Sequence, residues 1–196
     1  MVPMCGNPVG EGATLVRIVM TILYNKSMTP DKIFKYCPVC KNEVVFEINK
    51  ITCQNCGLEY YTNPAPCNGI IVRKNDSILL VRRKLDPQKG KLDFAGGFIE
   101  AGETAEESVK REIREELGCE LSSLSYFKSY ADVYTFNNVT YRTLGIIFVA
   151  TIKDDAIITP GDDVAGYEYI PMHEIPYDQI AFESVARALK DYISSL

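Results

Sequence analysis

The sequence predicts an α+β fold, in which helices pack on a mixed β-sheet and a small cysteine-rich module precedes them. Long alternating segments at residues 121–134 and 140–152 are typical of strands. Residues 104–118 have the periodicity of an amphipathic helix. Two C-x2-C pairs, separated by twelve residues, come before both and mark the separate module.

Length and charge limit the classes of function. The 196 residues suffice for one ordinary domain plus a small module, and 46% hydrophobic residues can build a core. The net charge is −5, so bulk electrostatic attraction to nucleic acid or to an anionic membrane is not expected. We therefore expect no DNA and no membrane as partner. An anionic substrate would need a local basic patch or a metal ion.

The first 27 residues stand apart from the rest. Their apolar run at residues 15–24 is interrupted by Arg17 and is too short to span a bilayer as a helix. No basic residue precedes the run within the segment, which argues against a secretory signal. We predict that residues 1–27 are a disordered or misassigned extension and that Met28 is the functional start.

Four of the seven cysteines form the two C-x2-C pairs: Cys37, Cys40, Cys53 and Cys56. The paired spacing and the odd total favour metal ligation over disulfides and indicate a reducing compartment, the cytoplasm. Two such knuckles resemble a zinc ribbon, which we assign to residues 28–63, with disulfides or iron as the alternatives. Four thiolates complete a tetrahedron, so the Zn²⁺ site would be structural.

The cysteine module does not have the charge of a nucleic-acid reader. Residues 37–62 hold two lysines and three glutamates, a net charge of −1, whereas a phosphate-binding ribbon should be basic. Residues 43–48 (EVVFEI) are predicted to form a strand. The module is therefore interpreted as a structural or interface element, and it could serve as the surface of a homodimer.

The second domain is predicted to begin with a β-hairpin. Residues 63–67 form a linker, and residues 69–73 and 77–83 form strands around a short turn. Arg82 and Arg83 end the second strand, and three lysines follow in the next eight residues. We expect these two arginines to contact substrate phosphates, with ordinary surface charge as the alternative.

The helix that follows has clear boundaries. Thr104 and Glu107 form a T-x-x-E capping box, and Gly118 is a typical residue just past the helix end. Its apolar stripe consists of residues four positions apart: Ala105, Val109, Ile113 and Leu117.

The same helix carries three glutamates on neighbouring positions, Glu112, Glu115 and Glu116. Glu112 and Glu116 flank the apolar stripe and should be half-buried. Carboxylates 5–6 Å apart repel by about 3 kcal/mol at an effective dielectric constant near 20, and the helix C-terminus disfavours anions further. A solvated acidic face is the simple interpretation. A divalent cation would reverse the sign of each unfavourable interaction.

The spacing of the whole stretch is Gly97, five residues, Glu103, seven residues, Arg111-Glu112-Ile113-x-Glu115-Glu116-x-Gly118-Cys119. This pattern resembles the complete Nudix box, although Ala95 stands where the family usually has Pro. The resemblance implies that residues 64–196 form an α/β/α Nudix sandwich. It further implies a Nudix hydrolase that cleaves, with Mg²⁺ or Mn²⁺, a diphosphate bond in a nucleoside diphosphate linked to another moiety.

Mg²⁺ prefers oxygen ligands, which carboxylates supply. We therefore assign Glu112, Glu115 and Glu116 as its ligands, and the family resemblance adds the carbonyl of Gly97. Gly96 and Gly97 would allow the backbone to approach the substrate phosphates closely.

Further residues are assigned supporting roles. Arg111 and Glu103 would hold the ligands in place. The family often has an acidic residue in the loop at 159–163, where Asp163 fits best, with an Asx turn as the alternative. Either Glu115 or Asp163 could take the proton of the attacking water, and the sequence does not choose between them.

The C-terminal half holds the aromatic candidates. Tyr134 and Tyr141 could stack on a nucleobase, whereas most other aromatics there should pack in the core. His173, the only histidine, lies at a turn and is expected on the surface. Residues 180–196 are predicted to form a helix that packs one face on the sheet.

A zinc ribbon ahead of a Nudix box resembles the NADH-diphosphatase-like branch of the family. That branch carries an S-Q-P-W-type motif after the box, and this chain contains no Trp, so NADH specificity is not carried over. The expected partner is a small nucleotide. Two alternatives stay open: a catalytically silent nucleotide-binding sensor, and an enzyme that processes RNA 5′ ends.

Overall fold

The computed structural model describes residues 33–161 and 163–196. The predicted extension at residues 1–27 lies outside this part of the chain. The described residues divide into two compact units: residues 33–62 together with 137–140, and residues 63–136 together with 141–196. The predicted domain boundary, between residues 63 and 64, lies one residue from the division after Thr62. Within the described residues, we find no helix with the length and apolar character needed to cross a membrane.

The first unit contains a three-stranded antiparallel sheet formed by β1 (Val45–Phe46), β2 (Lys50–Thr52) and β3 (Glu59–Tyr61). The strand predicted at residues 43–48 is shorter in the structure, because the Glu47 N–H donates to the Lys50 carbonyl over 2.7 Å and closes a tight turn. Ile51 is buried at the centre of the sheet. So small a core needs a further source of stability.

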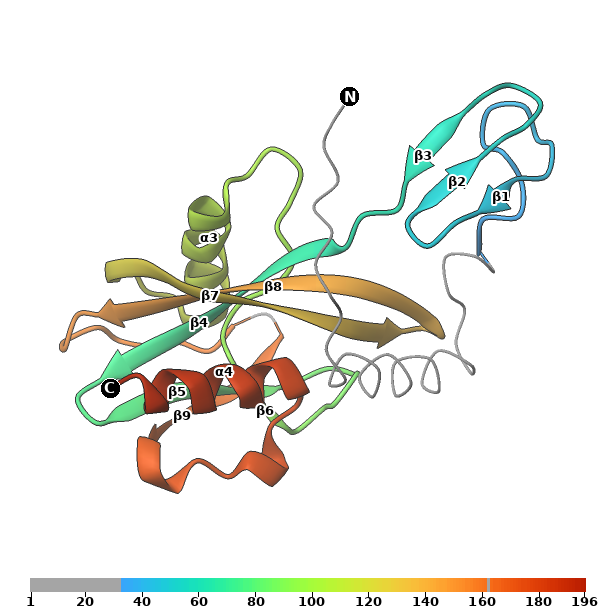
Figure 1. The fold of residues 1–196 in the computed structure, drawn as a ribbon. Helices are drawn as coiled ribbons and strands as arrows, with labels where there is room; N and C mark the ends of the chain where they lie inside the picture. Colours follow the sequence, from blue (N-terminus) through green and yellow to red (C-terminus); the bar gives the residue numbers. More distant parts are fainter. Residues whose placement is uncertain (1–32, 162) are drawn as a thin grey trace. The chain divides into compact units, whose positions relative to one another are not determined.

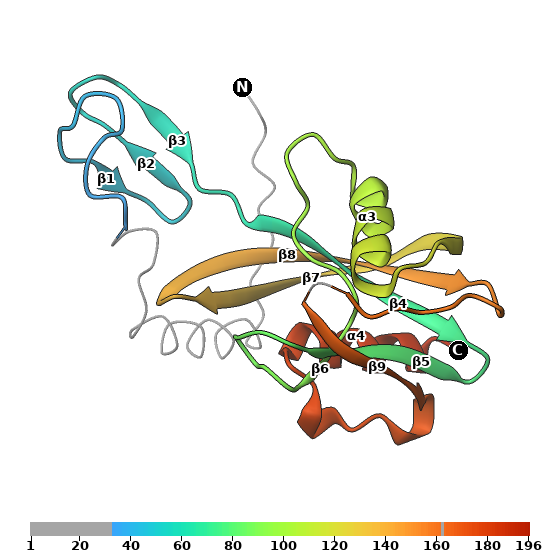
Figure 2. The same ribbon diagram turned by 180° about the vertical axis from the view of Figure 1, so that it is seen from behind.

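The second unit is built on a sheet of six strands, and the sheet is mixed, as predicted (Figures 1 and 2). Its strands are β4 (Ala65–Lys74), β5 (Ser77–Arg83), β6 (Leu92–Asp93), β7 (Leu121–Phe136), β8 (Val139–Ile152) and β9 (Val164–Pro171). Their order is β6-β5-β4-β8-β7, and β9 pairs with β5. The pair β4–β8 is parallel, whereas β5 pairs antiparallel with β4, β6 and β9.

Both faces of the sheet are buried, which explains the continuous apolar run of β4. Because side chains alternate along a strand, Ile70 and Val72 join the core beneath α3 (Ala105–Leu117). Ile71 joins the core beneath α4 (Glu183–Ser194). Figure 1 shows these two helices on opposite faces of the sheet. The predicted α/β/α arrangement is thus confirmed.

Two predicted boundaries were wrong for reasons of tertiary structure. Strand β4 begins at Ala65, inside the predicted linker, because its parallel pairing with β8 starts at Thr143. Helix α4 begins at Glu183, not at residue 180, because the Ala181 N–H donates to the Leu92 carbonyl over 2.8 Å and ties this stretch to β6. Two short 3-10 helices, η2 (Met172–Glu174) and η3 (Tyr177–Gln179), lead into it. His173 lies in η2 and is exposed, as predicted.

Candidate functional site

Helix α3 begins and ends where the sequence predicts. The Thr104 hydroxyl accepts from the Glu107 N–H over 3.2 Å, and the Glu107 carboxylate accepts from the Thr104 N–H over 2.8 Å. Such a cap contributes about 1 kcal/mol. Gly118 adopts a left-handed conformation, φ 64°, and its N–H donates to the Arg114 carbonyl. The capped helix fixes the positions of the three glutamates.

The glutamates of α3 lie in different environments. Glu112 and Glu116 are only 9% exposed, more deeply buried than predicted, whereas the Glu115 side chain is 44% exposed. Burial raises the pKa of Glu112. Burial also raises the pKa of Glu116 to about 8, and the nearby carboxylates of Glu112, Asp93 and Asp163 add to the shift. A bound cation would favour the ionised forms of these side chains.

Arg111 organises the carboxylates around it. Its Nε and Nη2 atoms donate to the two oxygens of Glu103 over 2.7 and 3.0 Å. Its Nη1 donates to Glu112 over 2.8 Å and to Glu115 over 3.0 Å, and Nη2 also donates to the Phe98 carbonyl. The guanidinium lowers the pKa of Glu103 to about 2. Arg111 and Glu103 therefore lie where the sequence analysis expects supporting residues.

The glycine pair lies directly against the glutamates. The Gly96 N–H donates to Glu116 Oε2 over 2.9 Å, and its φ of +137° disfavours other residues. A Cβ on Gly97 would lie 2.6 Å from Glu112 Oε1, a distance that real contacts do not reach. The Gly97 carbonyl accepts from the Asn68 N–H over 2.8 Å. A carbonyl oxygen has two lone pairs, so the bond to Asn68 leaves it able to bind a metal ion. Its role as a metal ligand stays a prediction.

Asn68 is a site residue that the sequence analysis missed. It is 6% exposed, and its Nδ2 donates to the Ser108 hydroxyl over 2.8 Å. This bond joins β4 to α3, and the same hydroxyl accepts from Arg111. Among the described residues, the Asn68 Oδ1 atom has no hydrogen-bond donor. An asparagine in an apolar strand gives no local signal of these contacts.

The loop before β9 covers the C-terminus of α3. The Gly161 N–H donates to the Glu116 carbonyl over 3.1 Å, and the Thr159 N–H donates to the Leu117 carbonyl over 2.9 Å. These bonds satisfy carbonyls that a helix end leaves without partners. Asp163 follows in the same loop and lines a cleft together with Glu112 and Glu116.

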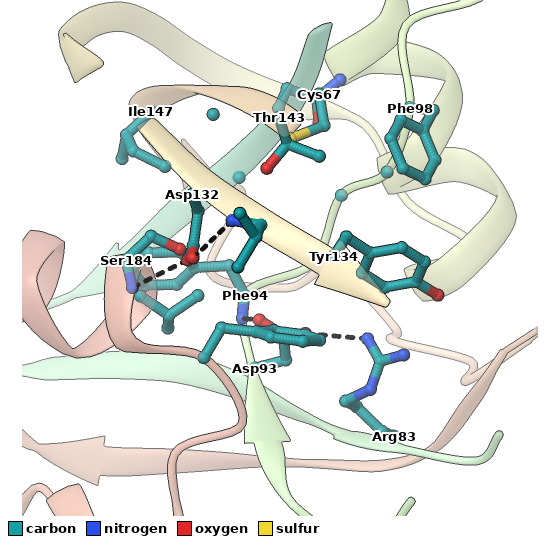
Figure 3. Close-up of a pocket in the computed structure, with 18 residues that line it drawn as sticks. Cys67, Arg83, Asp93, Phe94, Phe98, Asp132, Tyr134, Thr143, Ile147 and Ser184 are labelled. Atoms are coloured by element: carbon teal, nitrogen blue, oxygen red, sulfur yellow. Dashed lines mark hydrogen bonds and ion pairs between the residues drawn. The ribbon is translucent and has the colours of Figure 1, made fainter. Parts of the chain in front are cut away.

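The cleft has an acidic part and an apolar part, which share Arg83, Asp93, Phe94, Gly96, Gly97, Phe98 and Tyr134 in their walls. Among the described residues of the acidic part, five carboxylates face one guanidinium. The carboxylates belong to Asp86, Asp93, Glu112, Glu116 and Asp163. The apolar part also includes Ile147 (Figure 3), Phe182 and Val185. A diphosphate with a bound cation suits the acidic part, and a flat organic group suits the apolar part.

The structure separates the two arginines that the sequence analysis grouped. Arg83 lines the cleft, donates to Asp93 over 2.9 Å and lies over the Phe182 ring. Arg82 is not among the lining residues and pairs with Glu168 of β9. A register irregularity between the two arginines interrupts the pairing of β5 with β9. Only Arg83 is therefore placed to contact a substrate in this cleft.

The two candidate tyrosines are separated in the same way. Tyr134 lines both parts of the cleft and contacts Phe98 edge-on, with ring centroids 5.6 Å apart. Tyr141 is exposed and is not among the lining residues. The sequence analysis missed Phe98 and Phe182, which also line the cleft. Phe98 directly follows the glycine pair of the predicted site, and this position could have identified it. Phe182 comes from the C-terminal region, where no local sequence signal indicates a role in the cleft.

The four predicted cysteines come together in the first unit. Their sulfurs lie within 4.8 Å of one another, the one such group of three or more His, Cys, Asp or Glu ligand atoms found within the described residues. The closest pairs are Cys40–Cys53 at 3.4 Å and Cys37–Cys56 at 3.6 Å. Zn–S bonds of roughly 2.3 Å place tetrahedral sulfurs about 3.8 Å apart. The cluster thus fits a structural zinc ion in a small zinc ribbon.

Comparison with known proteins was made by sequence and by structure. Residues 64–190 match the family model of the NUDIX domain. A relative named ADP-ribose pyrophosphatase, from Methanocaldococcus jannaschii, is 34% identical over 135 residues, which cover 68% of this chain and 75% of the relative. Another, the NAD-capped RNA hydrolase NudC of Photobacterium profundum, is 36% identical over 96 residues, which cover 48% of this chain and only 36% of the relative.

A solved structure extends the likeness to the fold. The crystal structure of a NUDIX hydrolase from Nitrosomonas europaea aligns with a TM-score of 0.63 and 28% sequence identity. The alignment covers 82% of this chain and 91% of the other. Residues 64–190, which match the family model, contain α3 and the glycine pair.

Proposed function

The chain belongs to the Nudix family and is a Nudix hydrolase, and from this premise we propose that it hydrolyses a diphosphate bond in a nucleoside diphosphate linked to another moiety. One observation carries the proposal. Glu112 and Glu116, both buried, lie under the glycine pair in the acidic part of a cleft whose other part is apolar and aromatic. This arrangement offers one place for a cation with phosphates and another for an organic group.

The donor set of the acidic part suits Mg²⁺ or Mn²⁺. Both ions accept hard oxygen ligands, and the buried carboxylates outnumber the cationic side chains around them. Glu112 and Glu116 of this part would hold the ion, with the Gly97 carbonyl as a further ligand. Glu115, the third predicted ligand, is not among the lining residues and bonds to Arg111, so its side chain would have to turn toward the cleft to join them. When bound, the ion neutralises phosphate oxygens and lowers the pKa of a coordinated water.

The chain's own residues then bind and orient the substrate. Gly96 and Gly97 present backbone without side chains, so the phosphates can come close to the glutamates. Arg83 offers its guanidinium to a phosphate at the junction of the two parts. Phe98 and Tyr134 provide an aromatic wall for the organic group.

The general base remains one of two residues. Glu115 is exposed at the edge of the helix and receives one hydrogen bond from Arg111. Asp163 lines the cleft with Glu112 and Glu116. Each can accept a proton from water in its ionised form, and a pH–rate profile of the two amide variants would distinguish them.

Substrates like those of the relatives are the first candidates. ADP-ribose is the first candidate because the M. jannaschii relative, which shares 34% identity over most of its length, is named for that substrate. NAD-capped RNA is the second candidate because the NudC relatives are named for it, although this chain covers a smaller share of their length. The first candidate is favoured because the match is longer and the chain's acidic balance opposes binding of a polyanion.

The test is a hydrolysis screen of the full chain with Mg²⁺. The panel contains ADP-ribose, NADH, FAD, dinucleoside polyphosphates, nucleotide sugars, nucleoside triphosphates and NAD-capped RNA, with products separated by chromatography. We expect ADP-ribose to be cleaved to AMP and ribose 5-phosphate. Glu116→Gln should lower turnover on the order of 100-fold or more. Its melting temperature should not fall, because the amide replaces a carboxyl group whose raised pKa already favours the neutral form.

The matched control is Glu106→Gln, which neutralises an exposed glutamate in the first turn of the same helix. This variant should turn over like the wild type. Wild-type turnover by Glu116→Gln would contradict the ligand assignment. Nucleotide binding by calorimetry without any cleavage would favour the sensor, and preference for capped RNA would favour the second candidate.

A further inference from the structure

Asp132, a residue to which the sequence analysis gave no role, lies in the wall of the apolar part of the cleft. It belongs to β7, and its Oδ1 atom accepts from the Val133 N–H over 2.7 Å. Its Oδ2 atom accepts from the Ser184 N–H at the start of α4 over 3.2 Å. Figure 3 shows the carboxylate with its bond to Ser184, and Phe94 and Ile147 line the same part of the cleft.

The contact with Ser184 fixes the carboxylate in place. The N-cap residue of α4, Phe182, has no side-chain hydrogen bond to the helix. Asp132 therefore caps α4 from another element, and capping holds its side chain in one orientation. Each carboxylate oxygen accepts one backbone N–H, so the group keeps capacity for further donors.

The surroundings make this carboxylate selective. Phe94, Ile147 and Val185 are buried apolar residues that line the same part of the cleft. Asp132 makes no ion pair within the portion of the chain that the structure describes, and the lining arginine, Arg83, is paired with Asp93. A ligand group that enters here must therefore be largely apolar and present an N–H or O–H donor. An acceptor at the same place would face a carboxylate without compensation.

We propose that Asp132 selects the nucleobase by accepting a hydrogen bond from its exocyclic amino group. An ADP-linked compound is then preferred over its inosine analogue, which has a carbonyl oxygen in place of the amino group. The inference rests on the proposed function, because it places the base in the apolar part when the diphosphate occupies the acidic part. The aromatic walls favour a flat base over a sugar in this part.

The experiment compares ADP-ribose with its hypoxanthine analogue, IDP-ribose. We expect the wild type to prefer ADP-ribose on the order of 10- to 100-fold in kcat/KM, because the hypoxanthine carbonyl would leave the Asp132 carboxylate facing an acceptor in place of a donor. Asp132→Asn should reduce this preference to roughly threefold or less. The asparagine amide can turn and offer either an acceptor or a donor. Asn caps helices as well as Asp, but its single oxygen can accept from only one of the two backbone N–H groups, so the melting temperature should fall slightly while the protein stays folded.

The control variant is Glu183→Gln, which removes a negative charge from the first turn of α4 at an exposed position. It should keep the wild-type preference. A second measurement requires no variant: N6,N6-dimethyl-ADP-ribose lacks both N–H donors, and the wild type should turn it over as poorly as IDP-ribose.

Two results would overturn the inference. Equal turnover of ADP-ribose and IDP-ribose by the wild type would show that the base is not read. An unchanged preference in a folded Asp132→Asn would leave Asp132 with its capping role alone. If no diphosphate is hydrolysed, the proposed function fails separately. Calorimetry with ADP and IDP then tests the same preference in dissociation constants, and equal affinities would reject it.

Discussion

The cysteine cluster of the first unit and the glutamate cluster of the second are both metal-site candidates, but they are assembled differently. The four sulfurs lie within 4.8 Å of one another. Glu112, Glu115 and Glu116 form no such compact group in the described structure, and Arg111 bonds to two of them. A closed set of four ligands suits a structural ion, whereas a spread set leaves room for substrate and water.

The difference follows from what holds each ligand. Cys37 and Cys53 begin two equivalent turns, in which their carbonyls accept from the N–H groups of Lys41 and Gly57, both at positive φ. Each turn forms within six residues. The glutamates, by contrast, share one helix but depend on residues from elsewhere in the chain, such as Gly96 and Gly97. Local spacing thus determines the first site and tertiary contacts the second.

The largest effect is expected from breaking the closed site. Cys37→Ser removes one of four thiolates, and because zinc binding provides most of the folding free energy of so small a module, roughly 10–16 kcal/mol, the variant should lose its zinc. Elemental analysis should find far less than one zinc per chain, and deuterium exchange should speed up across residues 33–62. Cys119→Ala, a buried cysteine outside the cluster, should keep its zinc. A Cys37→Ser protein with one zinc per chain would contradict the assignment.

The next largest effect is expected at the glutamate cluster, when one glutamate is displaced but no ligand is removed. Gly97→Ala places a Cβ 2.6 Å from Glu112 Oε1, so the carboxylate must move. A displacement of about 1 Å can cost on the order of 100-fold in rate, and kcat should fall by 10- to 100-fold. Gly166→Ala is the control, because nothing lies within 4 Å of its Cβ. Wild-type kcat in Gly97→Ala would show that Glu112 needs no fixed position.

The smallest effect concerns stability and pH. Arg111 lowers the pKa of Glu103 to about 2, against 4.5 ordinarily. Between these pH values the unfolded chain binds more protons, so the pair stabilises the fold above pH 4.5 and loses this effect as the pH falls toward 2. Glu103→Gln should lower the melting temperature at pH 7, and the difference from the wild type should shrink at about pH 3. A difference that is constant over this range would reject the ionic origin.

Several features of this protein could be predicted because they depend on neighbours in sequence. The capping box of Thr104, the left-handed Gly118 and the paired cysteines each involve residues a few positions apart. The alternating strands predicted the mixed sheet for the same reason. The end of β5 shows the limit: Arg82 and Arg83 are equivalent in sequence, but their partners, Glu168 and Asp93, come from different strands.

By itself, then, the sequence determined the helix with its three glutamates, the cysteine ligands and the family. Only the tertiary structure decided how deeply Glu112 and Glu116 are buried, which arginine and which tyrosine line the cleft, and where α4 begins. It alone brought Asn68, Asp132 and Phe182 to the site. The physical reason is the separation of the interacting residues along the sequence. Helix caps and cysteine knuckles form between residues a few positions apart, whereas a cleft is formed by side chains from strands and helices far apart in sequence.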